Sequence, residues 1–392
     1  MDKPCTDTRA NLQQTKKDLM KRLLVGLCCC SAFFAGCKDE KTTAPPQPEN
    51  VNTMPAFYLP AAQGEYGTNT PYYEVIANSS DQVSLPWDLD FHPSRENELW
   101  VLNKGTERTG GSTVTITNAG LSNQKAEFRK DGNSWHFMAL PSAISFSQEN
   151  DNWANATEIL DANRRGGSFT GPSLWSSDMN VYAKPSGGNG SHLDMLHGSP
   201  YCMGIESDKD NAFWVFDGFN KHLCWYDFAV DHGPGNSDHD DGKIHRYREI
   251  ILTREPDVAS HMVLDKVTGW LYIVDSGTKR ILKVNTKTGT KKGNLNLTNE
   301  QLLEHWDMVG MDYKVFASSN LQKPSGIELS NGVIYVSDNE TGEIIAYNLE
   351  TGLELGRLDT GKKGIMGIKA DKNGLLWFVC ASTNEVIKIN PK

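Results

Sequence analysis

The sequence predicts an all-β fold, a six-bladed β-propeller with loop insertions, preceded by a signal peptide and a flexible tether. Three observations support this prediction: six copies of one short strand pattern, a scarcity of amphipathic helix patterns, and an N-terminal order of basic, apolar and cysteine residues. Repeats spaced by about 40–50 residues, with several strands in each, are typical of propeller blades. We therefore assign residues 65–392 to the propeller, 37–64 to the tether and 1–36 to the signal region.

The signal region has the pattern of a bacterial export signal. Met20-Lys21-Arg22 is basic, and the apolar stretch from Leu23 to Gly36 is shorter than the roughly 20 residues that a membrane-spanning helix needs. Because residues 1–19 are polar, Met20 is a candidate for the true start. Phe34-Ala35-Gly36-Cys37 resembles the bacterial lipobox, which implies that Cys37 is lipidated and becomes the mature N-terminus. The alternative is a plain signal peptide followed by an unrelated cysteine.

The segment after Cys37 is typical of a spacer between a membrane and a folded domain. Residues 41–56 are rich in Pro, Thr and Asn, which favours an extended chain. Lys38-Asp39-Glu40 resembles a surface-export tag, although it is equally typical of an ordinary solvated tether. We expect an outer-membrane lipoprotein of the cell envelope, facing the periplasm or the cell surface and bound to the membrane through its lipid. Nucleic acid is excluded as a partner, because the net charge is −10 and no basic cluster follows the signal.

One strand pattern recurs through the predicted propeller. Each copy has Pro or a small residue, a short apolar strand, a turn with Asp, Asn or Gly, and an aromatic-rich second strand that ends in Asp or Asn. Such runs between turn residues are typical of β-strands. The copies begin at Pro86, Pro141, Met203, His261, Pro324 and Met366, and the copy at Pro141 is the weakest. Their spacing requires insertions at 150–197, 231–244 and 294–321, and Asn299–His305 is the best candidate for a short helix.

These copies resemble the NHL repeat, whose pattern is Pro-x-Gly-Ile, a Gly turn, Ile-Tyr-Val-x-Asp and an Arg-Ile strand. Pro324 to Asp338 matches almost residue for residue, and His261 to Ile281 matches nearly as well. The resemblance covers Leu85 to Lys392 and implies a six-bladed propeller, but a fold of this kind does not imply one function. Since the last copy ends with its third strand, Glu385–Ile389, we expect Tyr72–Ala77 to close the ring as the fourth.

The first strand of each propeller blade lines the central channel. Its start is predicted to face one mouth of the channel, where the copies place Trp87, Ser142, Met203, His261, Ser325 and Met366. This set contains one strong metal ligand, two thioethers and no carboxylate. Peptidylglycine amidating lyases are NHL-like propellers with zinc-binding His residues at several of these positions, and only His261 matches them. The comparison argues against a lyase of that type.

Two insertions concentrate histidine and aspartate near the third blade. His192 and His197 lead into that blade, and His232 and His239 lie in a Gly-rich loop with four Asp residues after its third strand. Imidazole suits Zn or Cu and carboxylate suits Ca, so these residues and His261 form a candidate site for a divalent metal. The alternative is a solvated turn, because Asp, Asn, Gly and Pro all favour turns.

Three cysteines belong to the predicted propeller: Cys202, Cys224 and Cys380. An oxidising compartment permits disulfides, and Cys202 and Cys224 fall in the first and third strands of one copy. One interpretation is a disulfide between them, and the other is two small buried thiols that do not meet. Cys380 lies in an apolar strand and is expected to be a buried free thiol.

Two function classes fit these observations. The first is a membrane-anchored binding or scaffolding module that holds a protein or a small ligand at the propeller mouth. The second is a metal-dependent enzyme, either a lyase or a lactonase-like hydrolase, that uses His261 and the His-Asp insertions. The sequence contains no Gly-x-Ser-x-Gly elbow and no phosphate-binding loop of the complete Gly-x-x-x-x-Gly-Lys-Ser/Thr type. The choice between the two classes therefore depends on how the structure arranges these residues.

Overall fold

The computed structural model describes residues 71–184, 189–236, 238–296 and 300–390, which all belong to one structural unit of the chain. The signal region, Cys37 and the tether of residues 37–64 lie outside the described residues. Within the described ranges, no helix combines the length and the apolar character that crossing a membrane requires.

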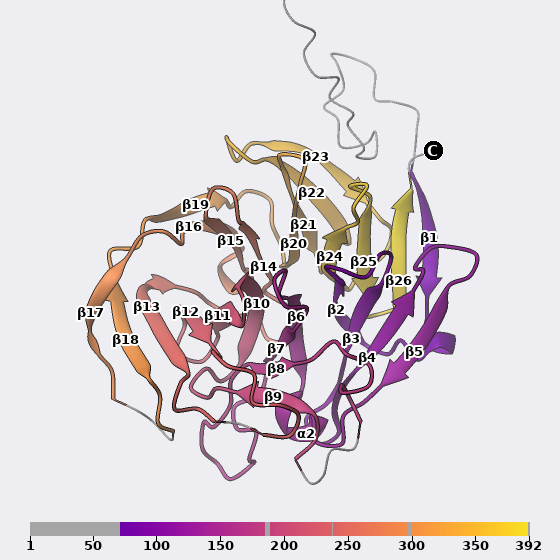
Figure 1. Ribbon diagram of the computed structural model, residues 1–392. Coiled ribbons are helices and arrows are strands. Elements are labelled where there is room, and N and C mark those ends of the chain that lie inside the picture. The colour runs from indigo at the N-terminus through magenta and orange to yellow at the C-terminus, as the bar shows by residue number, and fades with distance from the viewer. Residues whose placement is uncertain (1–70, 185–188, 237, 297–299, 391–392) are drawn as a thin grey trace, which may run out of the picture. The chain divides into compact units, whose positions relative to one another are not determined.

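The described chain folds into six β-sheets around a central axis, which are the blades of a propeller (Figure 1). This confirms the predicted all-β, six-bladed fold. Blade 1 contains β2 (Pro86–Phe91), β3 (Leu99–Thr106), β4 (Gly110–Thr117) and β5 (Lys125–Arg129), and blade 2 contains β6 (Pro141–Phe146), β7 (Trp153–Thr157), β8 (Ser173–Trp175) and β9 (His192–Met195). Blade 3 contains β10 (Cys202–Lys209), β11 (Ala212–Asp217), β12 (His222–Asp227) and β13 (Lys243–Ile251), followed by β18 (Glu304–Val309) and β17 (Thr290–Asn294).

The remaining blades have four strands each. Blade 4 contains β14 (Met262–Asp265), β15 (Trp270–Asp275), β16 (Arg280–Asn285) and β19 (Tyr313–Ala317), and blade 5 contains β20 (Pro324–Ser330), β21 (Val333–Asp338), β22 (Glu343–Asn348) and β23 (Glu354–Asp359). Blade 6 contains β24 (Ile365–Ala370), β25 (Leu376–Cys380), β26 (Glu385–Asn390) and β1 (Tyr72–Ala77). The described helices are single turns: η2 (Ser79–Asp81), α2 (Ser134–Phe137) and η3 (Ser276–Thr278).

The hairpin between β20 and β21 shows how the repeat encodes a blade. Asn331 and Gly332 have φ angles of 49° and 75°, as the tight turn of a two-residue hairpin requires. Ile334, Tyr335 and Val336 are all fully buried, because neighbouring blades cover both faces of the strand. Strands covered on both faces have continuous apolar runs rather than a strict alternation of polar and apolar residues. This explains why the copies alternate only loosely.

In blades 1, 4 and 5, the Asp or Asn of the second strand ties the blade to the loop before it. Its side chain accepts a hydrogen bond from a backbone amide of the preceding loop, as Asp338 does from Gln322 at 2.7 Å, Asp275 from Thr253 at 2.7 Å and Asn103 from Ser84 at 3.0 Å. The recurring Asp or Asn of the pattern is therefore a structural residue. In these three blades it fixes where the inner strand begins and so positions the residues that face the axis.

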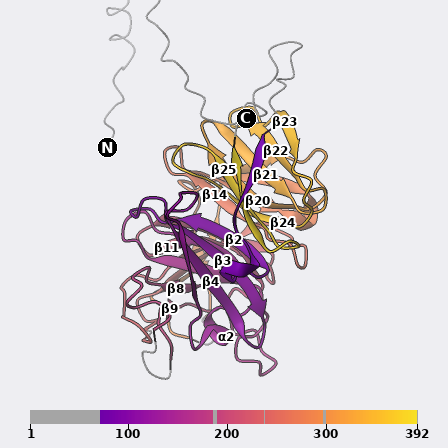
Figure 2. The ribbon, with the colours of Figure 1, turned by 90° about the vertical axis from the view of Figure 1, so that its right-hand side faces the viewer.

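The ring closes in blade 6 with strands from both ends of the described chain. β1 pairs antiparallel with β26, with Tyr72 opposite Asn390 and Val75 opposite Ile387. Figures 1 and 2 both show the indigo strand β1 among the yellow strands of this blade. The predicted closure by Tyr72–Ala77 is confirmed.

Blade 3 is extended by a hairpin that belongs to blade 4 in sequence. β17 and β18 lie between β16 and β19 in the chain, and the predicted insertion of residues 294–321 begins at the end of β17 and includes β18 and β19. β18 pairs in parallel with β13 and antiparallel with β17. The expected helix at Asn299–His305 is wrong for the described part of that segment, because residues 300–303 are not helical and a strand begins at Glu304. Backbone pairing with β13 outweighs the weak helical pattern of this short run.

Candidate functional site

Side chains at the central axis come from the inner strands β2, β6, β10, β14, β20 and β24. The residues predicted for the channel mouth have exposed fractions of at most 6%; they are Trp87, Ser142, Met203, His261, Ser325 and Met366. His261 Nε2 lies 2.8 Å from the Ser142 carbonyl oxygen, and the His261 amide donates to the Ser325 carbonyl at 3.0 Å. The Lys104 ammonium covers Trp87, 3.5 Å from its ring centre. This end of the axis is packed, and the expected mouth lies elsewhere.

The opening lies toward the other end of the inner strands, three residues further along each copy. A cavity of about 470 Å³, called the axial cavity below, is lined there by residues that include Asp90, Gln148, Glu206, Lys266, Glu328 and Lys369. Four of these occupy the same position in their copies, three residues after the residue predicted for the mouth: Asp90 follows Trp87, Glu206 follows Met203, Glu328 follows Ser325 and Lys369 follows Met366 at this spacing. This recurrence of charged residues is the signal that sequence reasoning missed.

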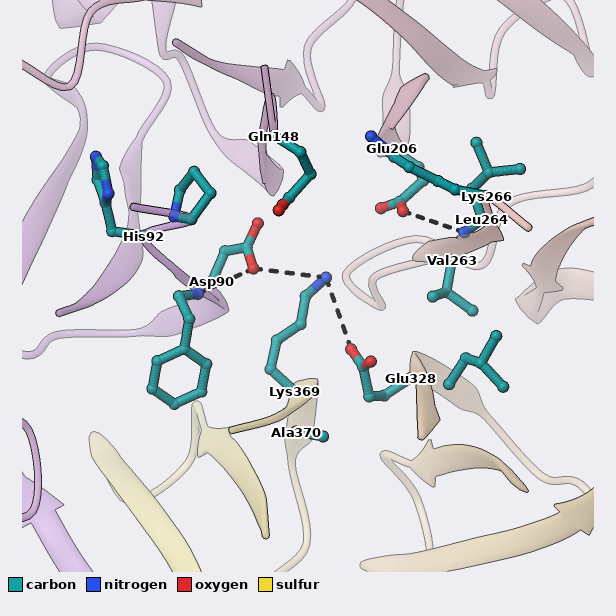
Figure 3. A pocket seen from close by; sticks show the side chains of 13 residues that line it. Asp90, His92, Gln148, Glu206, Val263, Leu264, Lys266, Glu328, Lys369 and Ala370 are labelled. Carbon is teal, nitrogen blue, oxygen red and sulfur yellow. Dashed lines mark hydrogen bonds and ion pairs between the residues drawn. The ribbon is translucent and has the colours of Figure 1, made fainter. Parts of the chain in front are cut away.

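The carboxylates of the axial cavity are held by the backbone of neighbouring blades. Asp90 Oδ2 accepts a hydrogen bond from the Phe146 amide at 3.0 Å, and Glu206 Oε1 accepts one from the Leu264 amide at 3.1 Å. Figure 3 shows Lys369 between Asp90 and Glu328, with its Nζ 3.7 Å from a carboxylate oxygen of each. The charged groups are therefore fixed in place around the cavity.

Burial controls the electrostatics of the axial cavity. It raises the pKa of Glu206 to about 7 and that of Glu328 to about 8, and it also raises the pKa of Asp90. Burial alone would lower the pKa of Lys369, but Asp90, Glu328 and Glu206 raise it above its usual value. Lys369 is the ammonium group that contacts two of these carboxylates, whereas Lys266 contacts Glu149 at 3.6 Å and acts on Glu206 at longer range. When they are ionised, the carboxylates around the cavity therefore carry more negative charge than the lysines neutralise.

Asp88 and His261 form a second polar pair on the axis. Asp88 Oδ2 accepts a hydrogen bond from the Ile144 amide at 2.9 Å, and Asp88 Oδ1 lies 3.4 Å from His261 Nδ1. A Cβ at Gly367 would lie 2.3 Å from Asp88 Oδ1, so only glycine fits there. Burial raises the pKa of Asp88 to about 8 and lowers that of His261 to about 4. His261 bonds to a backbone carbonyl through Nε2, so this nitrogen carries a proton and is not free to bind a metal.

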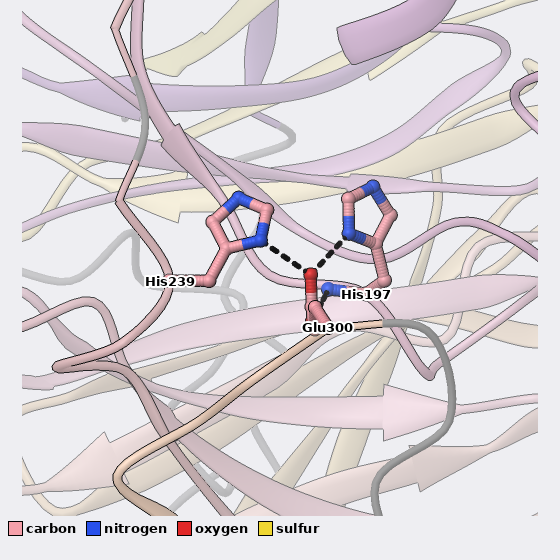
Figure 4. A group of neighbouring side chains, drawn as sticks. All are labelled: His197, His239 and Glu300. Carbon is pink, nitrogen blue, oxygen red and sulfur yellow. Dashed lines mark hydrogen bonds and ion pairs between the residues drawn. The ribbon is translucent and has the colours of Figure 1, made fainter.

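The structure brings together only two of the predicted metal-binding histidines. His197 and His239 meet at Glu300, from the blade 4 insertion, which sequence reasoning did not include (Figure 4). His192 instead stacks on Phe137, with 3.6 Å between ring centres. His232 Nε2 contacts Asp241 at 3.3 Å, and His261 belongs to the axis as described. No fixed spacing links Glu300 to the histidines, so no motif could have found it.

A second cluster of metal-ligand types, Asp217, His222 and Cys224, already holds a cation from the protein. Arg246 Nη1 lies 3.0 Å from Asp217 Oδ2, 3.2 Å from His222 Nε2 and 3.3 Å from Cys224 Sγ. The guanidinium occupies the centre of this buried group. The cluster is therefore a structural ion-pair network.

Of the two interpretations of Cys202 and Cys224, the structure agrees with two buried free thiols and not with a disulfide, and Cys380 is a buried free thiol as expected. Cys202 lies on β10 and Cys224 on β12, with β11 between the two strands. Two inter-strand spacings amount to roughly 9.5 Å, beyond the usual Cα–Cα span of a disulfide.

Comparisons with known proteins agree with this architecture. No protein-family model matches the chain, and no curated protein sequence matches it. Among solved structures, an auxiliary nutrient binding protein from Bacteroides ovatus has a TM-score of 0.54 and 11% identity, covering 83% of this chain and 78% of that chain. One from Bacteroides thetaiotaomicron has a TM-score of 0.55 and 10% identity, covering 83% and 77%. A luciferin-regenerating enzyme has a TM-score of 0.52 and 11% identity, covering 82% and 95%. At these identities the likeness shows a shared propeller fold.

Proposed function

We propose that the protein is a membrane-anchored, extracytoplasmic propeller that binds a small cationic ligand in the axial cavity. The observation that carries this proposal is the set of three carboxylates, Asp90, Glu206 and Glu328, which outnumber the two lysines that line an open cavity of about 470 Å³. A volume of this size suits a small molecule. The fold similarity to proteins named for auxiliary nutrient binding is consistent with a binding role.

The charge balance of the cavity indicates the class of ligand. A buried carboxylate is costly unless it is paired, and the raised pKa values of Glu206 and Glu328 reflect this cost. An organic amine or a divalent cation would supply the missing positive charge. Both ligand types share this chemistry, so the experiment must distinguish them.

We expect putrescine or Ca²⁺ to bind the purified protein more tightly at pH 8 than at pH 6, by about tenfold or more, because Glu206 and Glu328 ionise over that interval. Isothermal titration calorimetry with each cation, and with glucose as an uncharged control, measures this directly. Glu328→Gln should weaken the binding and reduce its pH dependence. Glu96→Gln, which alters an exposed carboxylate paired with Lys372 outside the cavity, should leave it unchanged. If neither cation binds, or if Glu328→Gln binds like the parent, the proposal is wrong.

A metal-dependent lactonase-like hydrolase or lyase is the second candidate function. It is favoured by the pKa of Glu206, about 7, since groups that titrate near neutral pH suit general acid–base catalysis. Lactone hydrolysis that requires Ca²⁺ and is lost in Glu206→Gln would favour this candidate over simple binding.

The membrane anchor is tested separately at Cys37. Replacing Cys37 by Ser is expected to move the protein from the membrane fraction to the soluble fraction, because the lipid would have no attachment site. Cell fractionation with immunoblotting measures the distribution, and Cys380→Ser, which alters a buried thiol of the propeller, is the control. A Cys37→Ser variant that stays in the membrane fraction would contradict lipidation at this residue.

A further inference from the structure

We propose that His197, His239 and Glu300 form a zinc site that joins three insertions beside blades 2 and 3. This site is separate from the axial cavity. His197 lies in the connection from β9 to β10, His239 in the loop from β12 to β13, and Glu300 in the loop from β17 to β18. The three residues are far apart in sequence, so a shared ligand would link segments that otherwise have little regular structure.

The donor atoms converge on one point. Glu300 Oε2 lies 2.5 Å from His197 Nδ1 and 2.6 Å from His239 Nδ1, and Figure 4 shows both rings directed at it. The amide of His197 donates to Glu300 Oε1 at 2.6 Å and fixes the carboxylate. His197 is itself held by Phe169, with 3.4 Å between ring centres. The two imidazole nitrogens and the carboxylate oxygen therefore lie close together, and a small side-chain movement that widens each N···O contact to roughly 3.3 Å would let all three bind one zinc ion.

A fully buried carboxylate behind the site is the second observation that points to a metal. Asp194 in β9 has an exposed fraction of 0%, and its Oδ1 lies 3.5 Å from His239 Nε2. Its Oδ2 has no hydrogen-bond partner within the described part of the structure. Histidines that bind a metal commonly donate their other ring N–H to such a carboxylate, which fixes the tautomer.

The hydrogen-bond partners of His239 fit either a charged imidazolium or a bound metal, and in both cases the buried Nε2 of His197 has no hydrogen-bond partner within the described part of the structure. Without a metal, the Nδ1 atom of each histidine must donate an N–H to Glu300 Oε2. His239 can then also donate from Nε2 to Asp194 only if it is a charged imidazolium. A metal bound by both Nδ1 atoms replaces those two protons, and a neutral His239 keeps its Nε2–H for Asp194. Each nitrogen of His239 then has a suitable partner.

The donor set selects zinc among the candidate metals. Two imidazoles and one carboxylate, with a further position for water, are a typical zinc ligand set. Ca²⁺ prefers six to eight oxygen ligands, which two imidazoles do not provide. The side chain of His239 is 21% exposed, whereas that of Glu300 is 7% exposed, so one side of the site is open to water and to the entry of the metal.

The test is zinc binding by the purified full chain after EDTA treatment and removal of EDTA. We expect uptake of one Zn²⁺ per chain by elemental analysis, and a higher melting temperature with Zn²⁺ than without it, since a ligand that binds the folded state stabilises it. His239→Ala should weaken Zn²⁺ binding at least about 100-fold, and Asp194→Asn about 10–100-fold as a residue that orients a ligand. His232→Ala is the matched control, because it removes a histidine of the same loop and should bind like the parent.

Two further measurements keep the test decisive. Glu300→Gln preserves the size of the side chain, so this variant should keep its fold, which circular dichroism can check. If it is folded but binds no zinc, the loss of binding is due to the missing carboxylate and not to unfolding. Co²⁺ in place of Zn²⁺ should give the intense visible absorption of a tetrahedral site in the parent and not in His239→Ala. Failure of the parent to bind Zn²⁺, or equal binding by His239→Ala and His232→Ala, would overturn the proposal and leave a hydrogen-bonded cluster.

Discussion

Replacing Lys369 by Met should destabilise the propeller by about 3–5 kcal/mol at pH 8, because removal of one partner leaves buried charge unpaired. The ammonium of Lys369 lies 3.7 Å from both Asp90 and Glu328, and its side chain is 15% exposed. Met keeps nearly the same length and shape, so lost packing contributes little. Urea unfolding followed by tryptophan fluorescence measures the change.

The effect of Lys369→Met should shrink as the pH falls. Burial raises the pKa of Glu206 to about 7 and that of Glu328 to about 8, so both carboxyls are largely neutral at pH 5 and need no cation. A raised carboxyl pKa gives stability that is complete below the unfolded value and is lost as the pH rises through the folded value. The parent should therefore lose stability from these groups between about pH 5 and pH 8, and the variant should lose more.

An exposed lysine supplies the control for this experiment. Lys372 pairs with Glu96 on the surface, and Lys372→Met should change the stability by no more than about 1 kcal/mol at either pH. Equal losses for Lys369→Met at pH 5 and pH 8 would contradict the charge argument, since a packing defect does not depend on pH.

Deletion of residues 71–78 should lower the free energy of unfolding by roughly 7 kcal/mol. This loss comes from about five backbone hydrogen bonds at about 1 kcal/mol each and from the burial of Ile76. β1 is the outer strand of blade 6 and pairs with β26 along its length. Its loss would uncover β26 and open the ring. Thermal unfolding and limited proteolysis should show a large drop in melting temperature and rapid cleavage.

The control for this deletion changes β1 without removing it. Tyr72→Ser alters a side chain that is 54% exposed and keeps the backbone pairing, so it should melt close to the parent. A shortened chain with the same melting temperature as the full chain would show that the ring does not depend on β1.

The sequence carried most of the information about the blades because that information is local. Asn331-Gly332 defines a hairpin by its own backbone preferences, and the apolar run of β21 identifies a strand covered on both faces. Tyr72–Ala77 was assigned to blade 6 by a count of strands, since a closed ring needs every blade complete. Such inferences require no knowledge of contacts between distant residues.

The candidate sites depend on contacts that no local pattern reveals. Alignment of the copies identified the inner strands, but which end opens depends on covering groups such as Lys104 above Trp87. Glu300 reaches His197 only because the blade 4 insertion pairs with blade 3. Cys224 is close to Arg246 rather than Cys202 because a neighbouring strand, β13, supplies the guanidinium.

The parallel pairing of β13 with β18 also bears on the self-association of blade 3. A nine-residue strand such as β13 at the border of a sheet would present a long row of free backbone groups to another chain. The β17–β18 hairpin covers the Lys243–Arg246 part of that row and leaves β17 as the new border there. β17 is short and carries Lys291 and Lys292, and charged lysines at a sheet border discourage strand addition. The insertion therefore disfavours self-association through the edge of blade 3.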